Sequence, residues 1–214
     1  MAAVPTGTLF SVATAFGNAV TVTGISNADP AVVTASAHGF SDGDIVEITS
    51  GWGRLNKRVF RVDNSTTGTF ELEGMDTSDT SFFPAGTGTG TAREVSSWQQ
   101  LSKVMNPSTT GGDPKTVVYK FLESDVEYAI NDGFTATSMS LEFDDDDTTA
   151  GYTAMRTLTD SQGNTILKML MRSGAVVYLP CTLAINDVPR LQDGQINRIS
   201  AQFAGNNRHT RYSA

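Results

Sequence analysis

The chain has 214 residues, of which 39% are hydrophobic and 18% charged, and its formal net charge is −8. This acidic balance argues against tight binding of nucleic acid, which needs clustered Lys and Arg, although it permits DNA as a transient neighbour. The one cysteine, Cys181, excludes a disulfide within the chain and a CxxC metal pair, and its alternating segment VVYLPCTLAI predicts a buried small side chain.

The first segment, TLFSVATAFGNAVTVTGI (residues 8–25), is rich in β-forming residues, and Gly17–Asn18 predicts a turn within it. The opening MAAVPTGTLF lacks the basic and apolar regions of a signal peptide. No apolar run has the length of a transmembrane helix. We therefore expect a soluble protein that is made in a cytoplasm and has no membrane partner.

Residues 25–93 differ in pattern and predict a small β module inserted into a main domain made of residues 1–24 and 94–214. Turn signals separate four strand candidates, which are Val32–Ser36, Ile45–Ser50, Arg58–Val62 and Thr69–Gly74. The segment SDGD predicts a hairpin turn centred on Asp42–Gly43 rather than a cation loop. The glycine-rich and threonine-rich segment 82–92 predicts an extended, exposed loop that closes the module.

The second half of the main domain begins with an ambiguous segment, EVSSWQQLSKVMN (94–106), and a breaker-rich loop, PSTTGGDP (107–114). A strand is predicted in KTVVYKFLES (115–124), with Val117, Tyr119 and Phe121 on one face. The next strand, TATSMSLEF (135–143), places Met139, Leu141 and Phe143 on an apolar face and small polar residues on the other. Such alternation is typical of a sheet with one solvated side.

Four consecutive aspartates, Asp144 to Asp147, follow this strand and precede a predicted helix. Tyr152, Met155 and Leu158 recur at a spacing of three, which suits one face of a short helix that Gly163 would end. The spacing of an EF-hand fails here, so we favour a helix cap by Asp147 or Thr148 over a metal site. Three alternating strands, TILKMLMRS, AVVYLPCTLAI and INRISAQFAG, complete a mostly β, α+β chain with one helix on its sheets.

No catalytic motif stands out in the chain. His38 lies in a turn and His209 in a polar tail, and neither GxSxG nor a phosphate-binding glycine loop occurs. Trp98 suggests a core or interface anchor, whereas Trp52, in a turn, is the more exposed candidate for stacking on a ligand. We expect no enzyme, no cofactor and no metal site.

The order of elements in residues 94–214 resembles the tail tube proteins of long-tailed bacteriophages. The segments that carry this resemblance are SLEFDDDD, TAGYTAMRTLTDSQGN, ILKMLMRSGAVVYLPCTLAIN and INRISAQFAGNNRHTRY. The inserted segment, with its AHGFSDGDIVEI, LN and FRV elements, is similar to a small β module that recurs in phage tail proteins. The resemblance implies a β-sandwich or barrel with one helix packed on the sheets and an inserted β-barrel-like module.

The resemblance also implies a structural virion protein that forms hexameric rings, stacked into the hollow tube of a non-contractile tail and assembled in the host cytoplasm. Its partners would be further copies, a tape-measure protein, tail terminator and tip proteins, and DNA in passage. Two alternatives stay open. One is a decoration or glycan-binding protein that uses Trp52, and the other is the tube protein of a contractile tail or secretion apparatus.

Three sets of residues follow as candidates for these roles. Residues 104–115 are expected to contact a neighbouring ring, because a loop that cannot bury itself can become ordered on a partner; their centre is Asn106, Pro107, Ser108, Thr109, Thr110, Gly111, Gly112 and Asp113. Acidic side chains expected to face the channel are Glu123, Asp125 and Glu142. Charges expected to meet between subunits are Asp144, Asp145 and Asp146 with Arg198, Arg208 and Arg211.

Overall fold

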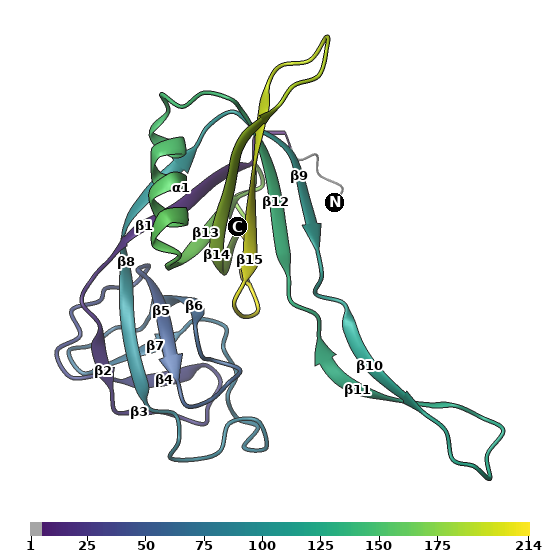
Figure 1. The fold of residues 1–214 in the computed structure, drawn as a ribbon. Coiled ribbons are helices and arrows are strands. Elements are labelled where there is room, and N and C mark those ends of the chain that lie inside the picture. The colour runs from purple at the N-terminus through teal and green to yellow at the C-terminus, as the bar shows by residue number, and fades with distance from the viewer. Residues whose placement is uncertain (1–5) are drawn as a thin grey trace.

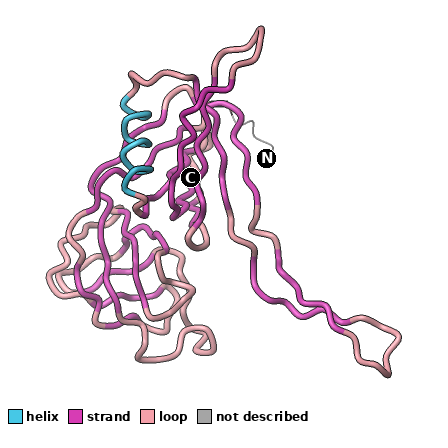
Figure 2. The backbone as a smooth tube through the Cα atoms, in the orientation of Figure 1, coloured by secondary structure: helices cyan, strands magenta, loops and turns pink. Residues whose placement is uncertain are grey.

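A computed structural model describes residues 6–214, which contain sixteen strands and one helix (Figures 1 and 2). Residues 1–5, the start of the predicted main domain and of the segment judged not to be a signal peptide, lie outside the described part. The strands are β1 (Leu9–Phe16), β2 (Val20–Val22), β3 (Gly24–Ile25), β4 (Ala31–Thr34), β5 (Ile45–Ser50), β6 (Arg58–Asp63), β7 (Thr69–Leu72), β8 (Gly90–Leu101), β9 (Val104–Thr110), β10 (Pro114–Tyr119), β11 (Tyr128–Phe134), β12 (Ser138–Asp144), β13 (Asn164–Leu170), β14 (Val176–Arg190), β15 (Arg198–Gly205) and β16 (Thr210–Tyr212), and the helix is α1 (Ala150–Ser161).

Fourteen of these strands form one strongly curled sheet in the order β3-β4-β7-β6-β5-β8-β1-β13-β14-β15-β12-β9, with β2 beside β8 and β16 beside β14. Strand β8 joins the two halves of this sheet, because its first residues pair with β2 and β5 and its last with β1. The segment 94–106, ambiguous in sequence, is therefore strand on both sides of a short break. Strands β10 and β11 form a separate two-stranded sheet.

The first half of the sheet surrounds a core between Val22 and Ala92 that includes Phe60 and Phe70. Strands β4 to β7 confirm the four strands predicted there, within a few residues at their ends. The turn predicted at Asp42–Gly43 is present, with the Asp44 N–H donating to the Ser41 carbonyl at 3.1 Å. The prediction that it joins a hairpin is wrong, because β4 pairs with β7 while β5 pairs with β6 and β8. Strand alternation does not reveal which strands are neighbours. The division into an inserted module and a main domain stays a prediction.

Trp52 corrects one expectation of exposure, whereas residues 82–89 of the predicted loop are mostly exposed, as expected. The indole of Trp52 is 2% exposed, and its N–H donates to the Pro84 carbonyl and to Thr87 Oγ1, each at 2.9 Å. Phe83, also buried, packs edge-on against it. The segment folds over Trp52 because this aromatic side chain and its N–H are both satisfied there.

The second core lies on the inner face of the curled strands β1, β13, β14, β15 and β12. It contains Leu141, Phe143, Phe203 and the buried Cys181, which confirms the predicted alternation and the buried thiol. Helix α1 covers this face through Met155, with Tyr152 and Leu158 partly buried beside it. The helical face predicted from sequence is therefore the one that packs.

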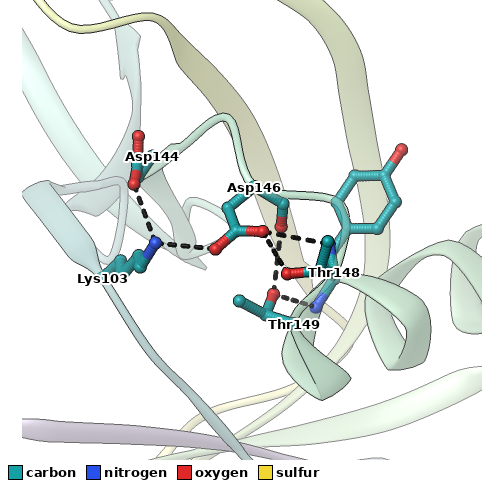
Figure 3. Close-up of polar contacts among 6 residues, drawn as sticks. Lys103, Asp144, Asp146, Thr148 and Thr149 are labelled. Carbon is teal, nitrogen blue, oxygen red and sulfur yellow. Dashed lines mark hydrogen bonds and ion pairs between the residues drawn. The ribbon is translucent and has the colours of Figure 1, made fainter.

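The aspartate run joins β12 to α1, but the helix cap lies one residue beyond the predicted pair (Figure 3). Thr149 is the N-cap, and its side-chain oxygen accepts from the Tyr152 N–H at 3.2 Å. Asp147 and Thr148 do not have this role. The carboxylate of Asp146 instead accepts from the N–H of Thr148 at 3.0 Å and from its hydroxyl at 2.6 Å. Because Asp146 and Thr148 form this turn, the helix begins later than the sequence predicts. Thr149 therefore takes the N-cap position, for which threonine is a favourable residue.

Candidate assembly surfaces

The hairpin of β10 and β11 extends away from the rest of the chain, as Figure 1 shows. Every residue of both strands is exposed, including Val118 and Ile130 at 58% each. The exposed apolar and aromatic side chains of the hairpin and its tip are Val117, Val118, Tyr119, Phe121, Leu122, Val126, Tyr128, Ile130 and Phe134. A contiguous apolar surface of this kind marks an interaction site.

The tip of the hairpin, residues 120–127, combines apolar and acidic side chains. The ring of Tyr119 stacks on Tyr128 with centroids 5.5 Å apart, and Phe121 packs edge-on against Tyr119. Glu123 and Asp125, two of the side chains expected to line a channel, lie in this tip and not on the main sheet. The tip therefore presents negative charge next to aromatic surface.

The loop predicted at residues 107–114 is largely strand. Residues 106–110 belong to β9 and pair with β12, with Thr110 opposite Ser138 and Ser108 opposite Ser140. The prediction of a loop is wrong here because β9 is an edge strand, where Pro107 costs no ladder hydrogen bond. Only residues 111–113 connect β9 to β10 as a loop. Contact of this segment with another ring stays a prediction.

Glu142 lies on the solvated face of β12, opposite Ser200 of β15 and two residues from Ser140. Its carboxylate accepts from Asn106 at 2.7 Å and forms ion pairs with Arg190 at 3.2 Å and Arg198 at 3.3 Å. The hydrogen bond from Asn106, followed by the field of the arginines, holds the pKa of Glu142 below its usual range. The network ties β9, β12, β14 and β15 together, so the charge of Glu142 is largely matched within the chain.

Lys103 neutralises part of the aspartate run (Figure 3). Its ammonium lies 3.0 Å from Asp144 and 2.7 Å from Asp146. Lys103 and the hydrogen bonds from Thr148 lower the pKa of Asp146 to about 2. Lys103 was not among the predicted partners, because 41 residues separate it from Asp144. Pairing of Asp144, Asp145 or Asp146 with Arg198, Arg208 or Arg211 of another subunit stays a prediction.

His38 is held within the fold, and residue types that could bind a metal are dispersed over the described part of the chain. The ring of His38 is buried, and its Nδ1 accepts from the Phe40 N–H at 3.1 Å. No three His, Cys, Asp or Glu side chains between residues 6 and 214 are grouped to hold a metal ion. In the same residues, no helix is both long enough and apolar enough to span a membrane.

The curled sheet, its solvated polar face and the projecting apolar hairpin are features of a structural protein with surfaces free for assembly. A family model described as phage tail tube protein, TTP, matches residues 50–214, and the chain belongs to this family. The resemblance found in the sequence is thereby confirmed, and the chain is a structural component of a tail tube.

Two solved structures are similar to this chain at low identity. One is the virion of a native gene transfer agent particle, with 12% identity and a TM-score of 0.44 over 54% of this chain and 89% of that one. The other is the tail of an empty gene transfer agent particle with C6 symmetry, with the same identity and TM-score over 54% of this chain and 87% of that one. Comparison with curated proteins gives no match.

Proposed function

We propose that this tail tube protein assembles into hexameric rings that stack into a hollow tube, through which DNA is delivered to the host. The observation that carries the proposal is the β10–β11 hairpin, whose apolar side chains have no cover within the described chain. Strand β9 leaves a second unpaired feature, the edge of the large sheet. Ring closure satisfies such edges by symmetry, and stacking covers the hairpin.

The contacts between rings would involve residues 104–115 together with the hairpin that they lead into. Gly111 and Gly112 have φ values of 78° and 82°, which set the direction in which the hairpin leaves β9. The hairpin is thereby a continuation of the predicted contact segment. Burial of its apolar side chains on another ring would supply the main driving force for stacking.

The channel wall would be the solvated face of β12 and β15, where Ser140 and Glu142 lie opposite Gln202 and Ser200. Small polar side chains offer DNA no positive charge to hold it. Glu123 and Asp125 belong to the projecting tip, so among the predicted acidic residues only Glu142 lies on this face. Because Arg190 and Arg198 both pair with Glu142, its negative charge is more than offset, and the wall would not be acidic at that point.

The partners, the place of assembly and the lack of catalysis follow if the tube serves only as a channel for DNA. The partners would be a tape-measure protein before DNA is packaged, terminator and tip proteins at the two ends, and DNA in passage. Assembly would take place in the host cytoplasm, in a non-contractile tail, with no enzymatic activity and no cofactor. A tube of a contractile tail or secretion apparatus is the second candidate. The glycan-binding alternative loses its support, since Trp52 is buried.

Negative-stain microscopy and sedimentation of the purified protein test the proposal. We expect rings or tubes with a central channel for the natural sequence. A variant in which residues 118–129 are replaced by an Asn-Gly turn should form rings that do not stack, because the apolar hairpin is lost. Monomers of the natural protein under all conditions, or tubes of normal length from the shortened variant, would contradict the proposal.

A further inference from the structure

A groove lined by methionines runs along the inner face of the sheet between β9 and β13. It consists of two adjoining hollows of about 730 Å³ and about 300 Å³, which share Thr109, Met139 and Met169. Met171 and Phe10 line the larger hollow, and Val177 and Leu179 line the smaller one. We call this feature the methionine groove. Methionine side chains adapt to the shape of an apolar partner, which suits a docking surface.

One end of the methionine groove opens onto a group of basic side chains. His209 lines the smaller hollow and also a third hollow that contains Arg208, Gly112 and Phe134. The guanidinium of Arg208 lies over the ring of Phe134 at 4.9 Å. Nearby, Arg58 donates to Thr210 Oγ1 at 3.4 Å. We call Arg58, Arg208, His209 and Arg211 the basic cluster.

Within the described residues, the arginines of the basic cluster lack ion-pair partners. Among residues 6–214, no carboxylate forms an ion pair with Arg58, Arg208 or Arg211, although the chain carries a net charge of −8. The Nε of Arg58 is buried without a hydrogen-bond partner in the same residues. Burial and the neighbouring Arg208 lower the pKa of Arg58 to about 10, as expected for positive charges crowded together.

The β10–β11 hairpin is complementary to both features. Its strands carry the exposed apolar side chains that an apolar groove can bury, and its tip carries Glu123, Asp125 and Glu127. The hairpin of one chain cannot meet its own groove in this structure, because it extends away from the sheet (Figure 1). The complementary surfaces are therefore available only between copies.

We propose that the methionine groove receives the β10–β11 hairpin of a second copy of this chain, with the acidic tip of that hairpin on the basic cluster. The inference rests on the proposed self-assembly and names its docking site. Because the basic cluster lies at the base of the receiving chain's own hairpin, each tip ends where the next hairpin begins. Such a heterologous contact does not close on itself and propagates as a linear stack.

Charge exchange tests the contact between tip and cluster. The variants Glu123→Lys/Asp125→Lys and Arg208→Glu/Arg211→Glu should each raise the protein concentration needed for tube formation by about tenfold or more, since like charges would meet at the contact. Combining all four changes should restore assembly to near the natural value. The control Asp63→Lys/Asp160→Lys makes the same change in net charge as Glu123→Lys/Asp125→Lys, on exposed sites elsewhere, and should leave assembly unchanged. Failure of the combined variant to recover, or normal assembly of both single-sided variants, would overturn the proposal.

Cysteine cross-linking gives a second readout that does not depend on tube formation. Cys181 is buried, so Leu122→Cys/His209→Cys adds the two reactive thiols at the tip and at the cluster. On oxidation we expect a ladder of covalent multimers, and none from Leu122→Cys/Asp160→Cys. Cross-links without tubes would support the docking and contradict the hollow tube, whereas tubes without cross-links would contradict the docking alone. Loss of DNA binding by Arg208→Glu/Arg211→Glu with unchanged assembly would assign the cluster to DNA instead and overturn the proposal.

Discussion

Asp146 shows how single side chains hold the junction between the large sheet and the helix. Its carboxylate joins Lys103 on one side and the turn at Thr148 on the other, immediately before the cap at Thr149 (Figure 3). The four consecutive aspartates therefore have different roles. Asp144 and Asp146 accept from Lys103, whereas the backbone N–H of Asp145 donates to the Asn197 carbonyl at 3.2 Å.

The lowered pKa of Asp146 predicts a loss of stability in acid. A carboxyl group whose pKa falls from 3.8 to about 2 on folding stabilises the folded chain above its ordinary pKa, and this contribution disappears as the pH falls from about 4 to 2. The variant Asp146→Asn should be less stable than the natural protein at neutral pH, and its free energy of unfolding should fall less across that range. Urea unfolding at a series of pH values measures both. Parallel curves for the two proteins would contradict the role given to Asp146.

At the scale of an element, the direction of the β10–β11 hairpin depends on a single residue, Gly111, at its base. A Cβ at this position would lie 2.0 Å from the Ala136 carbonyl oxygen, and its φ of +78° disfavours other residues. Gly111→Ala should therefore destabilise the β9–β10 connection by at least about 1 kcal/mol and misdirect the hairpin. Gly68→Ala, with open space around it, is the control.

Chemical unfolding and limited proteolysis of the hairpin check this prediction. Faster cleavage within residues 114–134 of Gly111→Ala, together with impaired stacking, is the expected result. Equal stability and equal protection of the two glycine variants would show that the β9–β10 connection does not require glycine at position 111.

Most strands and the helix could be predicted because the spacing of apolar residues within each segment shows which face is buried. Alternation identified the buried faces of β12 and β14, and a spacing of three identified the face of α1. Contacts between distant segments carried no such signal. The burial of Trp52 depends on a segment more than 30 residues away, and the basic cluster joins Arg58 to residues about 150 positions later. Strand β9 was missed because an edge strand tolerates the Pro and polar residues that otherwise indicate a loop.

At the scale of the whole molecule, the polar and apolar surfaces have separate tasks in the proposed tube. The solvated face of β12 and β15 would meet DNA, while the hairpin and the methionine groove would hold copies together. A mutation can therefore affect DNA passage without affecting assembly. Ser140, exposed on the polar face and outside the Glu142 ion pairs, is the position at which to separate the two.

Ser140→Lys should leave tube assembly intact and slow DNA ejection from phage particles that carry it. The substitution repeats a positive charge around each ring, and every such contact with phosphate favours retention of DNA. Ejection should regain speed at high salt, because counterions compete for the phosphates. The matched variant Asp160→Lys, on the exposed side of α1, should eject DNA at the natural rate. Unchanged ejection by Ser140→Lys would remove this face from the channel wall.

The most direct test of the account is a cryo-electron microscopy reconstruction of tubes assembled from the purified protein. We expect six copies in each ring, an open channel lined by Ser140, Glu142 and Gln202, and the hairpin of each copy buried on another ring. A filament without a channel, or a tube with the face of β12 and β15 on its outer surface, would contradict it.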